Sequence, residues 1–140
     1  MSAIVPNPAA FQELAAAPDN GPVVMLNLLK FKQQASDGSG SGAEAYGRYG
    51  EAAIKFVERT GGKLLWQGRA EQLLVGEPDE QDWDVVALVQ YPSRKAFLDM
   101  VANPDYMKSH GHREAGLEKT VLLACQSVGR SELLQAMSKS

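Results

Sequence analysis

Hydrophobic and polar positions form four blocks along the chain that predict β-strands. Residues 23–31 are almost uniformly apolar, which predicts a strand buried on both faces. Residues 63–75 alternate between apolar and polar side chains, which predicts a long strand with a bulge near Gly68. Residues 83–91 predict a third strand that forms an antiparallel hairpin with the second, and residues 120–128 predict the last strand.

A long helix is predicted between the first two strands. Ser41 and Glu44 have the spacing of a capping box, in which each side chain accepts from a backbone N–H of the other. A Gly-Gly pair at 61–62 ends the helical pattern. Gly47 and Gly50 weaken the helix by up to about 1 kcal/mol each relative to alanine. Close packing is the simpler explanation for these two glycines, and approach of a ligand to the backbone is the alternative.

Capping signals also predict shorter helices. Asn7, which precedes a proline, starts a helix near the N-terminus. Ser93 caps a short helix after the third strand, and Asn103, again followed by proline, separates it from a second helical stretch that reaches about Lys119. Residues 131–140 predict a short terminal helix that lies on the body or on a partner.

The segment 32–42 is predicted to be a loop. It consists mainly of Gln, Ser, Asp and Gly, a composition that is too polar to pack and that favours a mobile flap or a plain linker. Its glycines resemble a phosphate cradle only superficially. The segment lacks the Lys-Ser/Thr ending of a P-loop and the glycine spacing of a dinucleotide site, so nucleotide binding is not predicted.

The order strand, helix, strand, strand, helix, strand predicts an α+β fold of the ferredoxin-like βαββαβ type, with a four-stranded antiparallel sheet. Right-handed crossovers place both helices on one face of this sheet. We treat 1–140 as a single domain with its core in 22–128, an extra N-terminal helix in 1–21 and an extra C-terminal tail helix in 129–140.

The other face of the predicted sheet has an unexpected composition. It would meet water in a monomer, yet the first, third and last strands carry apolar residues on both sides. We therefore predict a homodimer in which two sheets pack face to face as a dimeric α/β barrel. A cavity is expected between each sheet and its helices.

Composition narrows the classes of partner. The chain has 140 residues, of which 44% are hydrophobic and 22% charged, with a formal net charge of -3. This acidic balance predicts no binding to nucleic acid or to an anionic membrane. The first eleven residues lack the pattern of a signal peptide, which predicts a cytoplasmic protein. The single cysteine, Cys125, has no basic neighbour in sequence and is predicted to be an inert buried thiol.

Several short motifs together carry a family resemblance. They are Tyr46 with the residues that follow it, Gly61-Gly62-Lys63, Gly68-Arg69-Ala70-Glu71, Tyr91-Pro92-Ser93, Asn103-Pro104-Asp105-Tyr106 and Arg113. Over roughly residues 22–126 the chain resembles the uncharacterised family called domain of unknown function 1330. The resemblance implies the fold and the sheet-on-sheet dimer of the dimeric α/β-barrel superfamily, but it implies no reaction. The N-terminal helix, the 32–42 loop and the tail depart from the short family pattern and would alter access to the cavity.

Two helical residues are the candidates for catalysis. His110 and Arg113 share a helix face, which would place a titratable imidazole beside a fixed positive charge at the mouth of a cavity. The alternative is an ordinary solvated helix face. His110 and His112 diverge by about 200° on a helix and cannot share a metal ion. No metal and no cofactor is therefore predicted.

Five further residues are candidates for substrate binding. Asn27 interrupts an apolar strand, so its amide needs hydrogen-bond partners. Arg69 and Gln90 lie at strand centres. Arg69 would hold a carboxylate or phenolate, unless it pairs with Glu71, with Glu77 or with a carboxylate of a partner chain. Tyr46 and Tyr49 face the core, and their hydroxyls would reach a ligand.

These features predict a protein that binds a small, partly aromatic organic molecule. One alternative is a cofactor-independent monooxygenase or isomerase. Some monooxygenases of the superfamily use Asn, Trp and His together, and Asn27, Trp83 and His110 offer these residue types. The other alternative is a non-catalytic dimeric structural module. The sequence leaves open whether the protein is an enzyme.

Overall fold

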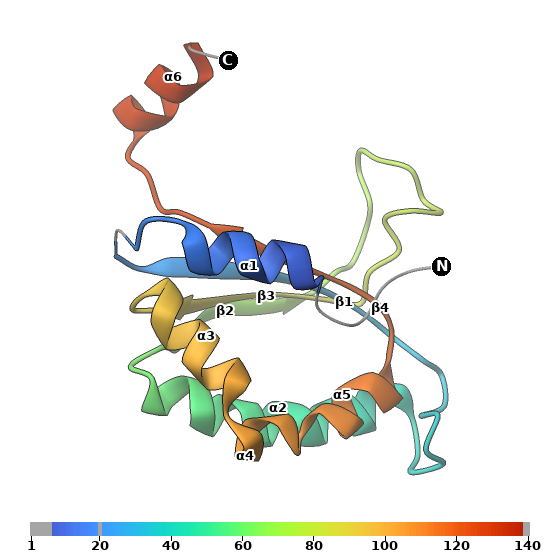
Figure 1. The fold of residues 1–140 in the computed structure, drawn as a ribbon. Coiled ribbons are helices and arrows are strands. Elements are labelled where there is room, and N and C mark those ends of the chain that lie inside the picture. The colour runs from blue at the N-terminus through green and yellow to red at the C-terminus, as the bar shows by residue number, and fades with distance from the viewer. Residues whose placement is uncertain (1–6, 20, 139–140) are drawn as a thin grey trace.

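The predicted ferredoxin-like core is present in the structure, a computed structural model that describes residues 7–19 and 21–138. Within these residues the four strands form one antiparallel sheet with the order β2-β3-β1-β4 (Figure 1). This is the order that βαββαβ connectivity produces. The strands are β1 (Val23–Phe31), β2 (Lys63–Arg69), β3 (Val85–Tyr91) and β4 (Leu117–Cys125).

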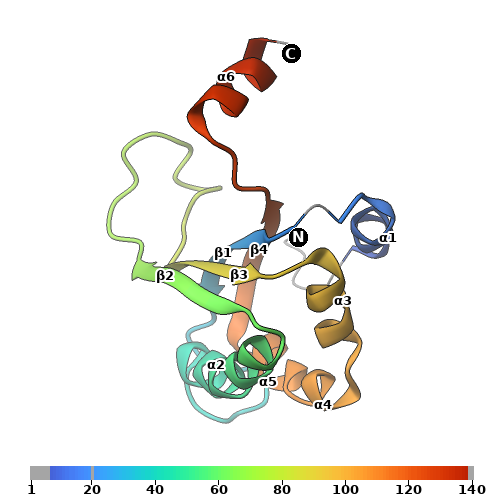
Figure 2. The same ribbon diagram turned by 90° about the vertical axis from the view of Figure 1, so that its left-hand side faces the viewer.

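Helices cover one face of the sheet. Figures 1 and 2 show α2 (Gly42–Arg59), α3 (Arg94–Ala102), α4 (Pro104–Met107) and α5 (His110–Gly116) on the same side. The helix α1 (Pro8–Ala16) packs beside α3, where the rings of Phe11 and Phe97 lie 5.9 Å apart. The last helix, α6 (Arg130–Ser138), lies on the opposite side of the sheet. None of the helices in the described residues is long and apolar enough to cross a membrane.

The predicted caps are confirmed. Asn7, Ser93 and Asn103 accept from early helical N–H groups, and Ser41 and Glu44 form the complete capping box of α2. These local signals therefore place the starts of the helices correctly.

The hairpin between β2 and β3 differs from the prediction. The two strands end at Arg69 and begin at Val85, so residues 70–84 form a long loop rather than an acidic turn. The irregularity in β2 lies between Leu64 and Trp66, not near Gly68. The base of the loop is held by contacts that sequence patterns do not show.

Contacts with β1 and β4 fix the base of the 70–84 loop. The Phe31 backbone N–H donates to the Asp84 carboxylate at 2.8 Å, and Asp84 N–H donates to a carbonyl of β1. Lys30 forms an ion pair with Asp82 at 3.2 Å, and the Lys119 ammonium lies 4.5 Å from the centre of the Trp83 ring.

The prediction that the loop after β1 is too polar to pack is wrong. Lys32 N–H donates to the Gly116 carbonyl at 2.8 Å, and Ser36 N–H donates to the Ala115 carbonyl at 3.0 Å. Ala35 is buried with Ala45 and Ala115 in a small second cluster. Hydrogen bonds between distant segments thus compensate for the polar composition, and the loop closes over the end of α5.

The attribution of two helical glycines to close packing is also wrong. A Cβ atom at Gly47 or Gly50 would meet no described atom within 4 Å. In contrast, a Cβ atom at Gly42 would collide with the backbone oxygen of Lys32. Only the first glycine of α2 is therefore required by packing.

We expect Gly47→Ala to stabilise the protein. Alanine removes the entropic cost of an interior helical glycine, so the free energy of unfolding should rise by about 0.5–1 kcal/mol. Gly42→Ala on the same helix should lower it by more than about 2 kcal/mol because the backbone must move. Urea denaturation of both variants measures the difference, and a destabilised Gly47→Ala variant would show that a contact at this position has been missed.

The two faces of the sheet follow from the strand register. Met25 lies opposite Val89, and Val23 lies opposite Tyr91; all four side chains belong to the core under α2 and α3. Directly opposed residues share a face, so alternate residues lie on the other side. We call that other side the open face. Its apolar residues are Val24, Leu26, Leu28, Trp66, Val86, Leu88, Val121 and Leu123.

Candidate functional site

The long helix α2 directs two tyrosines toward the sheet. Tyr46 and Tyr49 are one helical turn apart, and their ring centres lie 5.2 Å from each other. The ring of Tyr46 also lies 5.4 Å from that of Phe31 at the end of β1. Tyr49 is 9% exposed. Both predicted tyrosines therefore face the space between the sheet and the helices.

The break at Asn103 and Pro104 brings α4 and α5 against these tyrosines. Tyr106 of α4 is buried, and its hydroxyl lies 2.5 Å from the hydroxyl of Tyr49. The His110 ring lies 5.1 Å from the Tyr106 ring and 6.0 Å from the Tyr49 ring. We call Tyr46, Tyr49, Tyr106 and His110 the aromatic cluster.

Burial determines the protonation of the aromatic cluster. It raises the pKa of the Tyr46, Tyr49 and Tyr106 phenols, which therefore stay neutral hydrogen-bond donors. Burial and then the charge of Arg113 lower the pKa of His110. The same Arg113 charge acts on the three tyrosines and opposes the effect of burial on them. His110 is thus a neutral imidazole near pH 7, in a positive field.

Two histidine nitrogens remain unsatisfied. Nε2 of His110 and Nδ1 of His112 are buried and have no hydrogen-bond partner within residues 7–19 and 21–138. Buried polar atoms in native proteins are nearly always paired, so each exception calls for an explanation. A ligand that brings a polar group to His110 is one such explanation.

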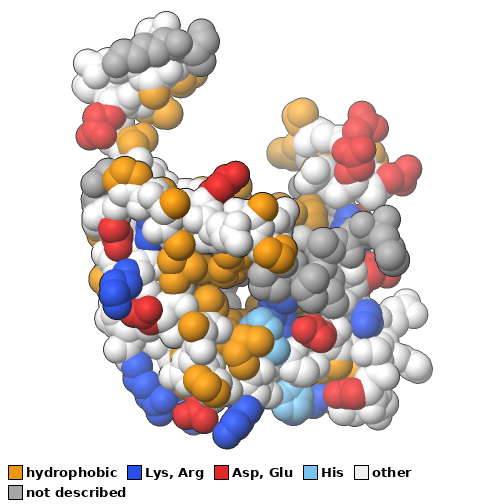
Figure 3. Space-filling view, in the orientation of Figure 1, with side chains coloured by type: hydrophobic (Ala, Val, Ile, Leu, Met, Phe, Trp, Pro, Cys, Tyr) orange, Lys and Arg blue, Asp and Glu red, His pale blue; other side chains and the backbone are white. Residues whose placement is uncertain are grey.

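The sheet supplies the other side of this space. Asn27 lies on the helix-covered face of β1, directly opposite Leu122 of β4, and its amide donates to the Met25 carbonyl at 3.2 Å. Leu122 is 41% exposed although helices cover this face. The helices therefore leave β4 partly open, and Figure 3 shows a hollow between the sheet and the helices, with histidine and apolar side chains beside it. We call this space the helix-side groove.

Two predicted binding residues lie elsewhere. Gln90 is directly opposite Val24 and Lys63, which places it on the open face and away from the groove. Arg69 ends the edge strand β2 and is exposed, and no acidic side chain in the described part of the chain forms an ion pair with it. The groove therefore combines Asn27, Tyr46 and Tyr49 with the catalytic candidates, without Arg69 or Gln90.

The residue trio suggested for a monooxygenase is not assembled. Trp83 lies in the 70–84 loop under Lys119, whereas Asn27 lies on the helix-covered face and His110 on α5. Lys119 is opposite Lys30 on the open face. Trp83 is therefore separated from the other two by the sheet.

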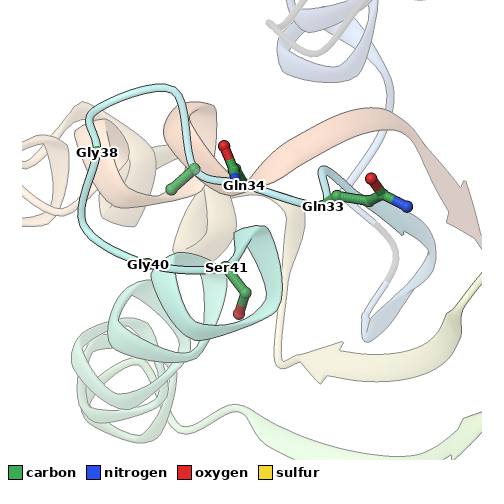
Figure 4. Close-up of a pocket in the computed structure, with 6 residues that line it drawn as sticks. Gln33, Gln34, Gly38, Gly40 and Ser41 are labelled. Atoms are coloured by element: carbon green, nitrogen blue, oxygen red, sulfur yellow. The ribbon is translucent and has the colours of Figure 1, made fainter.

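A separate pocket lies in the 32–42 loop and offers little chemistry. Its cavity volume is about 410 Å³, and it is lined by Gln33, Gln34, Ala35, Gly38, Gly40 and Ser41. Figure 4 shows the Gln33 amide and the Ser41 hydroxyl pointing in different directions. The described residues contain no cluster of three or more His, Cys, Asp or Glu side chains that would hold a metal ion.

Comparison with protein families identifies the chain. The model of the family described as domain of unknown function (DUF1330) matches residues 41–126. The chain belongs to the DUF1330 family. The matched segment is shorter than the resemblance over 22–126 predicted from motifs, but it contains the aromatic cluster and both catalytic candidates.

Solved structures of one bacterial protein are similar to this chain over most of its length. RPA0582 from Rhodopseudomonas palustris, a protein of unknown function, is 37% identical with a TM-score of 0.85, and the match covers 92% of this DUF1330 protein and 99% of that chain. The methylated RPA0582 protein gives 38% identity and a TM-score of 0.84, with coverage of 92% and 97%.

More distant structures share the fold alone. At3g17210 from Arabidopsis thaliana has 15% identity and a TM-score of 0.56, with coverage of 76% of this chain and 96% of that one. A dabb family protein with a ferredoxin-like fold from Mesorhizobium loti also has 15% identity, with a TM-score of 0.55 and coverage of 79% and 100%. No curated protein matches this DUF1330 chain.

Sequence patterns missed two residues of the candidate site in this DUF1330 protein. Tyr106 precedes His110 by four positions, a helical spacing that would have predicted their contact. The family motif that contains Tyr106 does not itself show this contact. The burial of His112 depends on how α5 packs against α2. The spacing of Tyr106 and His110 was visible in the sequence, whereas the burial of His112 was not.

The stability of this DUF1330 protein should vary with pH through the protonation of His110. Its pKa is lowered in the folded state from 6.5, so the unfolded chain binds this proton more readily. The contribution to stability is complete above the unfolded pKa and is lost as the pH falls through it toward the folded pKa. We expect the free energy of unfolding of His110→Gln to change less with pH than that of the wild type, between about pH 7.5 and about pH 5.5. Urea denaturation across this range measures it, and an unchanged slope would contradict the assignment.

Proposed function

We propose that this DUF1330 protein is a homodimer that binds a small, partly aromatic organic molecule in the helix-side groove. The buried, unpaired Nε2 atom of His110, bordered by the rings of Tyr49 and Tyr106, is the observation that carries the proposal. Leaving such an atom unsatisfied costs about 1–3 kcal/mol. A ligand hydroxyl or carbonyl group at this position would remove that cost.

The groove residues indicate the chemical class of the ligand. Tyrosine rings favour a flat aromatic body through edge-to-face and stacked contacts. Neutral phenols and the Asn27 amide offer hydrogen bonds to one or two polar groups. The positive field of Arg113 favours a ligand oxygen with partial negative charge, such as a phenol, an enol or a carboxylate.

The open face supports the homodimer. Trp66, Val121 and Leu123 on this face are 55%, 37% and 52% exposed. A contiguous apolar patch of this kind marks an interaction site in a soluble protein. A second copy of the same sheet is complementary in both shape and composition, and the closed dimer leaves the groove on the outer side of each sheet.

Titration calorimetry with 2-naphthol, an aromatic probe with one hydroxyl, tests ligand binding. We expect binding to the wild-type protein, and binding at least about tenfold weaker for His110→Ala, because the loss of one buried hydrogen bond costs about 1.4 kcal/mol. Lys108→Ala, a change at the exposed residue that follows α4, is the matched control. Equal binding by the His110→Ala and Lys108→Ala variants would contradict the site. Absence of binding in all three proteins would favour the non-catalytic dimeric module.

Catalysis is the second candidate function. An isomerase or a cofactor-independent monooxygenase begins by removing a proton from its substrate. The lowered pKa leaves His110 neutral and able to accept that proton, and Arg113 would stabilise the resulting oxyanion. Wild-type protein should then accelerate deuterium exchange at the benzylic carbon of 2-tetralone, whereas His110→Gln should not. If deuterium exchange with the wild-type protein is no faster than in buffer alone, catalysis is contradicted and ligand binding stands as the proposed function.

A further inference from the structure

The chain carries a C-terminal arm that leaves the body of the protein. Residues 126–138 are all exposed, and Figures 1 and 2 show α6 standing clear of the sheet on its open side. Leu133 and Leu134 of α6 are 48% and 52% exposed. A helix of nine residues is marginal in water because isolated helices need about 12–15 residues. The apolar side of α6 therefore needs a cover from outside the body described here.

The 70–84 loop is a second projection on the same side of the sheet (Figures 1 and 2). The ion pair of Lys30 with Asp82 fixes its base. Its tip exposes Leu74 and Val75, which are 83% and 92% accessible. An anchored base with an apolar tip is typical of a contact surface rather than of a solvated loop.

The open face alone is small for a stable dimer. Its four strands have seven to nine residues each. With about 4.8 Å between strands and about 3.3 Å per residue, they cover roughly 500 Å². A standard interface buries about 800 Å² on each partner. The arm and the loop flank this face and offer the apolar surface that makes up the difference.

The two projections stand at opposite ends of the open face. The arm follows Cys125, which lies opposite Val24 at the start of β1, whereas the loop is paired with Lys30 near the end of β1. Two sheets packed face to face can be related by a two-fold axis along the strands or across them. An axis along the strands brings the same ends of the two sheets together, so the arm of one subunit meets the arm of the other and loop meets loop. An axis across the strands brings opposite ends together, so the arm of one subunit meets the 70–84 loop of the other.

Charge distinguishes these arrangements. The 70–84 loop contains six acidic residues and no basic residue, so two loops in contact would repel each other. We propose that α6 of each subunit packs against the 70–84 loop of the other, with Leu133 and Leu134 beside Leu74 and Val75. This inference rests on the proposed homodimer. It gives every dimer two identical arm contacts, one at each end of the paired sheets.

Cysteine cross-linking of the full-length chain tests this contact. Cys125 is the only cysteine in the sequence, so Cys125→Ser provides the background for Leu74→Cys and Leu134→Cys. We expect the variant with both new cysteines to form a covalent dimer on mild oxidation with diamide, and neither single-cysteine variant to do so. A covalent dimer from Leu134→Cys alone would overturn the proposal, because it requires arm on arm. A double variant that is dimeric but forms no covalent link would also overturn it.

A second measurement separates this proposal from the homodimer on which it rests. Leu134→Glu should raise the dimer dissociation constant by about tenfold or more, as measured by sedimentation velocity. Met107→Glu, on the exposed surface of α4, should leave it unchanged. A monomeric wild-type chain would overturn the homodimer itself, whereas a wild-type dimer that Leu134→Glu does not weaken would overturn the arm contact alone.

Discussion

Replacement of Leu123 with aspartate is expected to convert the proposed dimer to a monomer. Leu123 lies on the open face in the edge strand β4, opposite Leu26, and is 52% exposed in the single chain. Because the interface repeats every residue twice, each dimer would lose two buried leucines and gain two buried charges. Losing about 1.5–3 kcal/mol per leucine alone weakens association by about 10²- to 10⁴-fold.

Light scattering after size exclusion measures the result for Leu123→Asp. The variant should remain folded, because this side chain meets water in the single chain and does not contribute to the core between the sheet and the helices. Met107→Asp, at a comparably exposed position on α4, is the control and should stay dimeric. A dimeric Leu123→Asp protein would show that the subunits associate through another surface.

The buried hydroxyl pair of Tyr49 and Tyr106 gives the second large effect. Tyr49→Phe or Tyr106→Phe alone leaves one buried hydroxyl without its partner at 2.5 Å. Each single change should lower the free energy of unfolding by about 1–3 kcal/mol. The double variant should be close to wild type, because both polar groups are removed together and the two rings keep their places.

A double-mutant cycle in urea measures this coupling. The two single effects should sum to more than the effect of the double variant, with an interaction energy of about 1 kcal/mol or more. Tyr91→Phe provides a comparison for a buried tyrosine outside this pair. Strictly additive effects of Tyr49→Phe and Tyr106→Phe would show that the two hydroxyls are not paired in solution.

Local sequence signals predicted the starts of α1, α2, α3 and α4 correctly. Asn7, Ser41, Ser93 and Asn103 each accept from the helical N–H groups that their positions predicted, because a cap is formed by residues close in sequence. Contacts between distant residues were not predictable. The hydrogen bonds from the 32–42 loop to the end of α5 join segments about eighty residues apart.

The candidate site was predicted in part, and strand parity explains the principal error. Asn27 of β1 lies opposite Ala87 of β3. Gln90 is also on β3, an odd number of positions after Ala87. Adjacent strand residues point to opposite faces, so Gln90 lies on the open face. Register depends on how two strands pair, and a single sequence does not encode it locally. Helical spacing explains why Tyr46 and Tyr49 lie together on α2, and why His110 and Arg113 lie one turn apart on α5.

Imidazole nitrogen NMR of the full-length protein tests the groove most directly, because the sequence contains only two histidines. A His112→Gln variant assigns the two rings. On addition of 2-naphthol, we expect a shift of the His110 Nε2 resonance that saturates with binding, because this buried atom gains its missing partner. Saturable binding of 2-naphthol that leaves the His110 resonances unmoved would place the ligand elsewhere and contradict the helix-side groove as the binding site.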